Sequence, residues 1–216
     1  MDISTIRSKI RAGYGKAALK LGESCAIYRP AGTTAAIVSG NLIATQLAAF
    51  DTKPTFSFVN PTNFKNRLFY ALTDATSIEV GDYLVSGGQT YFVATLDDIA
   101  PPMVVRCDRT LTIKRPQPGT PGYDYYGSNA ASSEETILTG WPAAVLTGTK
   151  GEGTISKLPG DVRAPWVLLM MPAAAGVQIQ FADILYDDLA TPSRYVVSNV
   201  IYSALGAEIT ASQALI

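Results

Sequence analysis

Residues 78–84 read IEVGDYL and residues 179–185 read IQFADIL, so one apolar–Asp–apolar stretch occurs twice, 101 residues apart. A second pair follows in the same order, YFV at residues 91–93 and YVV at residues 195–197. In both copies the chain then enters a long segment in which apolar and polar residues alternate. We therefore predict that one small β-unit has been duplicated within the chain.

The strands are predicted from periodicity and turn residues. Gly87 and Gly88 separate two apolar runs, a pattern typical of a β-hairpin. From residue 105 to residue 113 the apolar residues fall on one side of an extended chain and the polar residues on the other, as they do again at residues 205–212. The predicted fold class is mainly β, with two tandem antiparallel barrel-like or sandwich-like units.

Four segments are predicted along the chain: a basic amphipathic helix within residues 1–24, a first β-unit at 25–116, a Pro/Gly/Tyr-rich linker at 117–140 and a second β-unit at 141–216. The helix is expected over residues 3–21, with Gly22 as the left-handed residue past its end. Its apolar face is formed by Ile3, Ile6, Ile10, Tyr14, Ala17, Ala18 and Leu21.

The composition argues against catalysis. The chain of 216 residues has no histidine, the commonest general base and metal ligand, and its two cysteines, Cys25 and Cys107, have no metal-type spacing. Cys107 falls on the apolar side of its strand, which favours a buried thiol. The glycine- and lysine-containing stretch at 148–153 lacks the spacing of a phosphate-binding loop. We predict no enzyme activity and no catalytic, metal-binding or cofactor-binding residues.

Asp82 and Asp183 occupy matching positions of the two copies. A paired-carboxylate hydrolase needs both acids in one cleft, whereas equivalent positions in two separate units keep them apart. We predict that they are structural turn acids, whose side chains accept backbone amide hydrogens where a strand begins.

The helix carries five cations, Arg7, Lys9, Arg11, Lys16 and Lys20, and the acidic residue Asp2 precedes it. One interpretation is a solvated face on a helix that is held by its isoleucines. The alternatives are a helix that docks on an acidic partner ring, or one that faces a DNA-filled channel. Five cations give salt-sensitive attraction without sequence specificity.

Two loops are candidates for subunit contacts. The tyrosines of residues 117–140 either dock on a neighbouring subunit or fold back onto their own barrel. A second segment, 147–165, is rich in glycine and contains cations that a partner would order. The candidate residues in the two loops are Tyr123, Tyr125, Tyr126, Lys150, Lys157 and Arg163.

The N-terminus lacks the uninterrupted apolar core of a signal peptide. The most apolar stretch, at residues 166–177, is broken by Pro172 and is too short to span a bilayer. We expect a soluble protein that is made in the cytoplasm.

The pattern Ile78-x-x-Gly81-Asp82-x-Leu84, a Gly-Gly turn and YFV at 91–93 resembles the strand–turn–strand core of tailed-bacteriophage head–tail joining proteins. The wider chain is similar to a group of phage particle proteins in a set of short motifs: IYRP at 27–30, RCDRT at 106–110, TGWPA at 139–143 and KLPGDVR at 157–163. The chain departs from the single-barrel joining proteins because it has two units and because Ala182 replaces Gly81 in the second.

The resemblance implies a non-enzymatic structural component of a virion, in the neck or tail, assembled in the host cytoplasm. Its partners would be copies of itself in a cyclic ring and other particle proteins such as portal, adaptor or tail components. DNA would be near without specific contact, and no membrane would be involved. The competing hypothesis is a receptor- or carbohydrate-binding β-module, in which the loop tyrosines would stack on sugars beside an open groove.

Overall fold

The computed structural model describes residues 2–51, 67–97, 99–116, 134–147, 166–174 and 176–213. In these residues the chain forms one α-helix, a short 3-10 turn (Ser39–Asn41) and twelve strands. The helix and strands of the N-terminal half are α1 (Ile3–Leu21), β1 (Glu23–Tyr28), β2 (Leu42–Asp51), β3 (Leu68–Leu72), β4 (Tyr83–Ser86), β5 (Gln89–Thr95) and β6 (Met103–Cys107). The other strands are β7 (Arg109–Pro116), β8 (Glu134–Thr147), β9 (Trp166–Met171), β10 (Ile184–Asp187), β11 (Arg194–Ser203) and β12 (Gly206–Gln213).

The strands form two antiparallel barrels that repeat one topology. The first barrel runs in the order β1-β2-β3-β6-β5-β4 and closes between β4 and β1. The second runs β7-β8-β9-β12-β11-β10 and closes between β10 and β7. Each strand of the first barrel thus corresponds to the strand six places later. The predicted fold class, two antiparallel β-barrel units preceded by a helix, is confirmed.

The boundary between the two units differs from the prediction. The alternating run at 105–113, predicted as a single strand that closes the first unit, is divided at Asp108 into β6 and β7. β7 pairs with β8 and β10, so it opens the second barrel. β8 begins at Glu134, within the predicted linker 117–140. The alternation continues across the break because both strands have a buried side.

The barrels pack against each other through an apolar contact. Leu84, Tyr91 and Val93 belong to one buried cluster of the first barrel. Neighbouring residues on the opposite side of the same strands, such as Tyr83 and Phe92, belong to a second cluster that extends into the second barrel. The Tyr83 hydroxyl donates to the carbonyl oxygen of Pro142 at 2.7 Å, and its ring meets that of Trp141 edge to face.

A segment after β1 also crosses between the barrels. Residues 33–36 run beside β8, where Thr34 forms a parallel bridge with Thr139. The amide of Ala35 donates to the carbonyl oxygen of Thr139, and the amide of Thr139 donates to that of Thr33. We call residues 33–36 the strap. The strap adds backbone hydrogen bonds to the apolar contact between the barrels.

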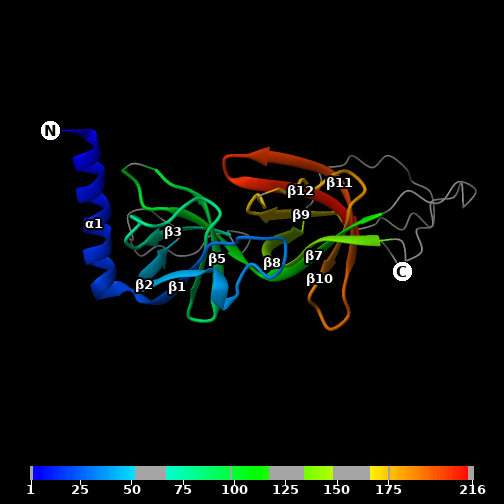
Figure 1. The fold of residues 1–216 in the computed structure, drawn as a ribbon, viewed down its shortest axis with the longest axis horizontal. Helices are drawn as coiled ribbons and strands as arrows, with labels where there is room; N and C mark the ends of the chain where they lie inside the picture. Colours follow the sequence, from blue (N-terminus) through cyan, green and yellow to red (C-terminus); the bar gives the residue numbers. More distant parts are fainter. Residues whose placement is uncertain are drawn as a thin grey trace, which may run out of the picture.

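Helix, first barrel and second barrel lie in a row (Figure 1). α1 contacts β2 and β3, and its end at Gly22 lies against Ala48 of β2. At the corresponding place of the second barrel, the amide of Asp108 at the end of β6 donates to the carbonyl oxygen of Ala143 of β8. The contact of the helix with the first barrel therefore corresponds in position to the contact of the first barrel with the second.

Candidate assembly interface

The side of α1 that faces the barrel differs from its predicted apolar face. Arg7, Arg11, Tyr14 and Ala18, spaced four, three and four residues apart, are all at least half-buried, and Ala18 is fully buried. The Tyr14 hydroxyl donates to the carbonyl oxygen of Ile99 at 2.6 Å. Successive residues of a helix are turned by 100°, which places this side next to the centre of the predicted apolar face and not at that centre. We call the predicted apolar face the apolar stripe.

Much of the apolar stripe is consequently exposed. Ile3 and Leu21 are 63% and 66% exposed, and Ile6 is also exposed. Ile10 and Ala17 are half-buried. Leu19, outside the stripe, is 70% exposed. The interpretation in which the isoleucines hold the helix therefore applies only to part of the apolar face.

The five cations of the helix divide into two groups. Arg7 and Arg11 lie on the side toward the barrel, whereas Lys9, Lys16 and Lys20 are exposed. Lys9, Lys16 and Lys20 are seven and four residues apart, so they share the side of the helix that faces away from the barrel. We define the outer surface of α1 as Ile3, Ile6, Lys9, Lys16, Leu19, Lys20 and Leu21. This surface combines apolar and cationic side chains and holds no acidic residue.

Two glycines let the helix sit close to the barrel. A Cβ at Gly15 would lie 3.1 Å from the Cβ of Asp74, and one at Gly22 would lie 2.9 Å from the amide nitrogen of Ala48. Gly22 has φ −90° and ψ 158°, so it is extended rather than left-handed as predicted. The chain passes directly from α1 into β1, and close approach is the reason that glycine fits there.

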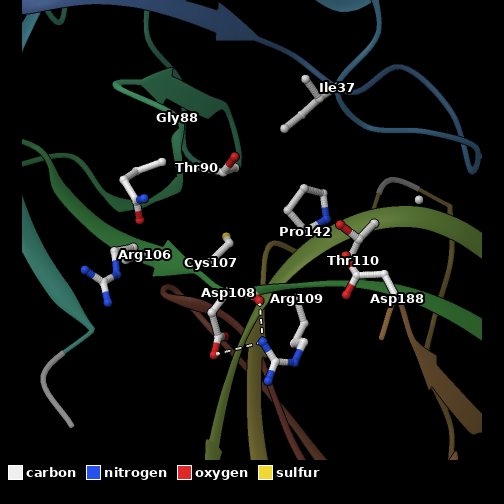
Figure 2. A pocket seen from close by; sticks show the side chains of 12 residues that line it. Ile37, Gly88, Thr90, Arg106, Cys107, Asp108, Arg109, Thr110, Pro142 and Asp188 are labelled. Atoms are coloured by element: carbon white, nitrogen blue, oxygen red, sulfur yellow. Dashed lines mark hydrogen bonds and ion pairs between the residues drawn. The ribbon is translucent and has the colours of Figure 1, made fainter. Parts of the chain in front are cut away.

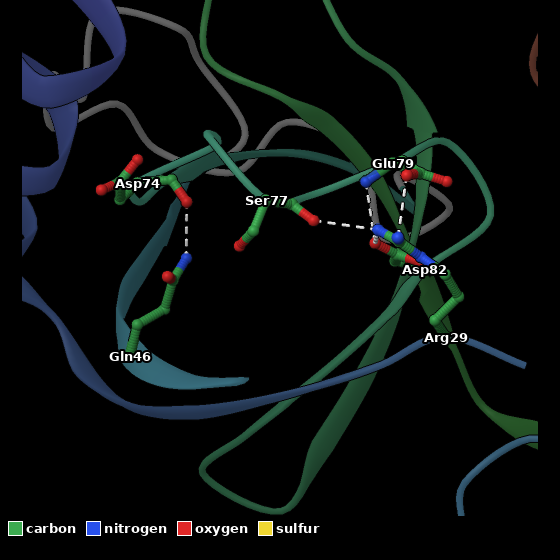
Figure 3. A network of polar contacts seen from close by, with 6 residues as sticks. All are labelled: Arg29, Gln46, Asp74, Ser77, Glu79 and Asp82. Atoms are coloured by element: carbon green, nitrogen blue, oxygen red, sulfur yellow. Dashed lines mark hydrogen bonds and ion pairs between the residues drawn. The ribbon is translucent and has the colours of Figure 1, made fainter. Parts of the chain in front are cut away.

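The turn acid of the first barrel is held by an arginine (Figure 3). Arg29 donates from Nε to Oδ1 of Asp82 and from one terminal nitrogen to Oδ2, both at 2.8 Å. Asp82 Oδ2 also accepts the amide hydrogen of Glu79 at 2.7 Å, the capping role predicted for this residue. Arg29 further donates to the carbonyl oxygen of Ser77. The hydrogen bonds that Arg29 donates to Asp82 raise the pKa of Arg29, although partial desolvation opposes the shift.

The second barrel repeats these contacts. Arg115 donates to both oxygens of Asp183 at 2.9 Å and to the carbonyl oxygen of Gln178 at 2.7 Å. Asp183 Oδ2 accepts the amide hydrogen of Gln180 at 2.7 Å. Asp183, like Asp82, is 1% exposed. We call Arg29–Asp82 and Arg115–Asp183 the two clamps. They lie in separate barrels, so the two acids do not form one site.

The arginines of the clamps were missed in the sequence analysis. Arg29 is 53 residues from Asp82, and Arg115 is 68 residues from Asp183, so no local motif joins them. A usable signal was present, because Arg29 and Arg115 each follow the start of a barrel's first strand by six residues. That signal requires the correct unit boundary at Asp108, which the alternating pattern concealed.

A groove of about 550 Å³ lies where the barrels meet, lined among others by Ile37, Arg106, Cys107, Arg109 and Asp188 (Figure 2). Two of its arginines already contact other groups of the protein. Arg109 donates to the carbonyl oxygen of Asp108, and Arg106 lies over the ring of Phe69.

Asp108 itself is engaged in the joint between the barrels. Its Oδ2 accepts from Arg67, and its Oδ1 accepts the amide hydrogen of Val145, at 2.9 and 2.8 Å. Together with the ion pair between Arg109 and Asp108 at 4.0 Å, these bonds hold Asp108 in the joint between the barrels. Across the described ranges, no three His, Cys, Asp or Glu side chains are grouped as a metal site would require.

The two thiols are free and buried in different clusters. Burial raises the pKa of Cys25 to about 12, and it also raises the pKa of Cys107. Neither forms a reactive thiolate near neutral pH. The prediction of a buried structural thiol at Cys107 is confirmed.

The predicted loop contacts fall outside the described residues. These are Tyr123, Tyr125, Tyr126, Lys150, Lys157 and Arg163. Their two interpretations, subunit contact and sugar stacking, stay predictions.

Comparison with known proteins gave no family for the chain. No protein-family model, curated protein sequence or solved structure matched it. Within the part of the chain that the structure describes, no helix has the length and apolar content needed to cross a bilayer.

Proposed function

We propose that this chain is a non-enzymatic structural component of a bacteriophage particle, placed in the neck or tail, where it acts by packing against neighbouring subunits. The phage context comes from the sequence resemblance of the hairpin core and the short motifs. The outer surface of α1 is the observation that carries the proposal. Its leucine and isoleucine side chains are exposed at one end of the molecule, where a neighbouring subunit would bury them.

Two further features support an assembly role. Both barrels are closed, so among the described strands the first and last of each sheet are paired and offer no edge for strand addition. Association through the described barrels therefore uses their faces or the helix. The strap and the Tyr83 contact join the two barrels into one rod, so the position of one end fixes the position of the other.

Quantitative mass spectrometry of purified virus particles from the source tests the proposal. We expect the chain to be present at a small copy number relative to the major capsid protein, at a multiple typical of cyclic rings. Absence from the particles would refute the structural role and would return the tyrosine loop, with a glycan screen, to first place.

A further inference from the structure

Charge is distributed unevenly between the helix and the rest of the chain. α1 holds five of the 17 lysine and arginine residues and none of the 18 acidic residues. The remainder therefore has 12 cations and 18 acids, and the net charge of −1 conceals a basic helix attached to an acidic body. Opposite charges on two surfaces of one molecule attract copies of that molecule to each other.

We propose that the outer surface of α1 docks on the acidic barrel body of a second copy of this chain, in a heterologous contact. The proposal deepens the proposed function and rests on it, because repeated heterologous contacts build rings when the rotation closes. In this contact the exposed leucine and isoleucine side chains are buried from solvent, and the lysine side chains form ion pairs with carboxylates.

The charge pattern selects helix-to-barrel docking over helix-to-helix docking. A two-fold contact between two α1 helices would bring Lys9, Lys16 and Lys20 of both copies together, with no acid in either helix to offset them. Like charges at close range destabilise a contact. The acidic body offers exposed carboxylates, among them Asp188 and Glu79, of which Glu79 also pairs with Arg29 of its own chain.

The apolar side chains favour protein over DNA as the occupant. A phosphate backbone is bound by cations and hydrogen-bond donors, and affinity depends on how many phosphates are neutralised. The outer surface of α1 offers three lysines, which are flanked by Ile3, Leu19 and Leu21, and these apolar side chains gain nothing from phosphates. A protein surface uses both kinds of side chain.

Sedimentation equilibrium of the purified full chain tests the docking. The wild type is expected to self-associate, and more weakly as salt rises from about 0.1 M to about 1 M, where the Debye length falls from about 10 Å to about 3 Å. The double variant Lys9→Gln with Lys20→Gln should raise the dissociation constant at least about tenfold at the lower salt. Leu19→Ser should also weaken association, by removing apolar burial.

A matched control changes the net charge equally but on the body. Gln178→Glu with Gln180→Glu adds two negative charges at exposed positions of the second barrel, and is expected to leave association equal or stronger. Circular dichroism checks that every variant keeps its fold.

Three sedimentation results would overturn the proposal. These are a monomeric wild type at all concentrations, equal association of the lysine variant, and tighter association of that variant, which would indicate helix-to-helix pairing.

A zero-length amine–carboxylate crosslinker identifies the contact directly. In an equal mixture of unlabelled and ¹⁵N-labelled chains, links between copies should join Lys9, Lys16 or Lys20 to acids of the barrels. Links within single copies alone would refute the docking. Binding of duplex DNA by α1 in place of self-association would refute it too. If the chain is present in particles at ring copy number but does not self-associate, the proposed function stands and this inference fails.

Discussion

At the scale of single residues, the clamps explain why each barrel keeps an acid that is almost fully buried. A buried carboxylate is costly unless its lone pairs are used and its charge is balanced. Asp82 meets both needs, because a planar guanidinium binds both of its oxygens and a backbone amide binds one of them again. Lysine cannot supply this fork, so the arginine is specific.

Removing the arginine should therefore destabilise either barrel by a similar amount. We expect Arg29→Ala and Arg115→Ala each to lower the free energy of unfolding by about 2–3 kcal/mol, less than for a fully buried pair because the arginines are partly exposed. Urea titration measures the change.

Glu79→Ala is the control for Arg29→Ala. Glu79 also pairs with Arg29, but its side chain is 68% exposed, so the loss should stay within about 0.5 kcal/mol. If Glu79→Ala costs as much as Arg29→Ala, burial of Asp82 is not the source of the effect.

The turn before each clamp acid needs a left-handed residue. Gly81 has φ 93° and Ala182 has φ 68°, and their amides donate to the matching carbonyl oxygens of Val93 and Val197. This conformation costs L-residues energy that glycine avoids. We expect Ala182→Gly to stabilise the protein and Gly81→Ala to destabilise it, each by about 0.5–1 kcal/mol, in thermal or urea unfolding. If both substitutions stabilised the protein, or both destabilised it, this account of the turn would be contradicted.

The buried thiol of Cys25 makes stability depend on pH in the alkaline range. Burial raises the pKa of this thiol to about 12 in the folded state, above its ordinary value of 9.0. Below pH about 8.5 the thiol is neutral in both states and stability is unaffected; above it the unfolded state loses its proton first, and stability falls as pH rises toward 12.

Cys25→Ala is expected to remove this contribution. Above pH about 9, the free energy of unfolding of the variant should fall less steeply than that of the wild type, by up to about 1.4 kcal/mol per pH unit. Urea titrations at a series of pH values measure it. Buried tyrosines such as Tyr83, whose pKa burial also raises, leave a residual fall in both proteins. Parallel curves for wild type and variant would show that Cys25 does not contribute.

At the scale of elements, the sequence predicted the helix, the duplicated hairpins and the turn role of Asp82 and Asp183, because these depend on local patterns. It did not predict that the run at 105–113 serves two barrels. Alternation reports that a strand has one buried side and carries no information about which sheet it joins. The break is made by Asp108, whose bonds to Arg67 and Val145 are long-range.

The side of α1 that packs on the barrel could not be predicted from the local sequence pattern either. Helical periodicity located an apolar stripe, but the seat on β2 and β3 is shaped by close approach at Gly15 and Gly22. The helix is therefore rotated away from the centre of its stripe. A helix buries the side whose shape fits the surface below it, and the part of the apolar stripe that stays exposed is available to a partner.

The strap provides a test of the joint between the barrels. Gly140 has φ 70°, and a Cβ there would lie 3.0 Å from the Cα of Ala35. Gly140→Ala should lower the free energy of unfolding by about 1–3 kcal/mol and increase proteolysis near residues 33–36.

Gly32→Ala is the control for the strap, since a Cβ at Gly32 meets nothing within 4 Å. It should have little effect on unfolding or proteolysis. Equal effects of the two substitutions would show that the strap does not hold the barrels together.

At the scale of the whole molecule, the duplication gives a directional stack. The face that joins the first barrel to the second includes Phe92 and Val105, which pair with each other. The corresponding pair in the second barrel is Val196 and Ser212, smaller and more polar. The contact of the helix with the first barrel thus corresponds to the contact between the barrels, and at this pair the second barrel offers a less apolar surface than the first.

Symmetry-imposed electron cryomicroscopy of the virus neck and tail tests the central claim, an assembled particle component, most directly. The account predicts a ring whose subunits are rods of two closed barrels, with α1 of each subunit against the barrel body of its neighbour. A neck and tail resolved throughout, with every density assigned to other chains, would contradict it.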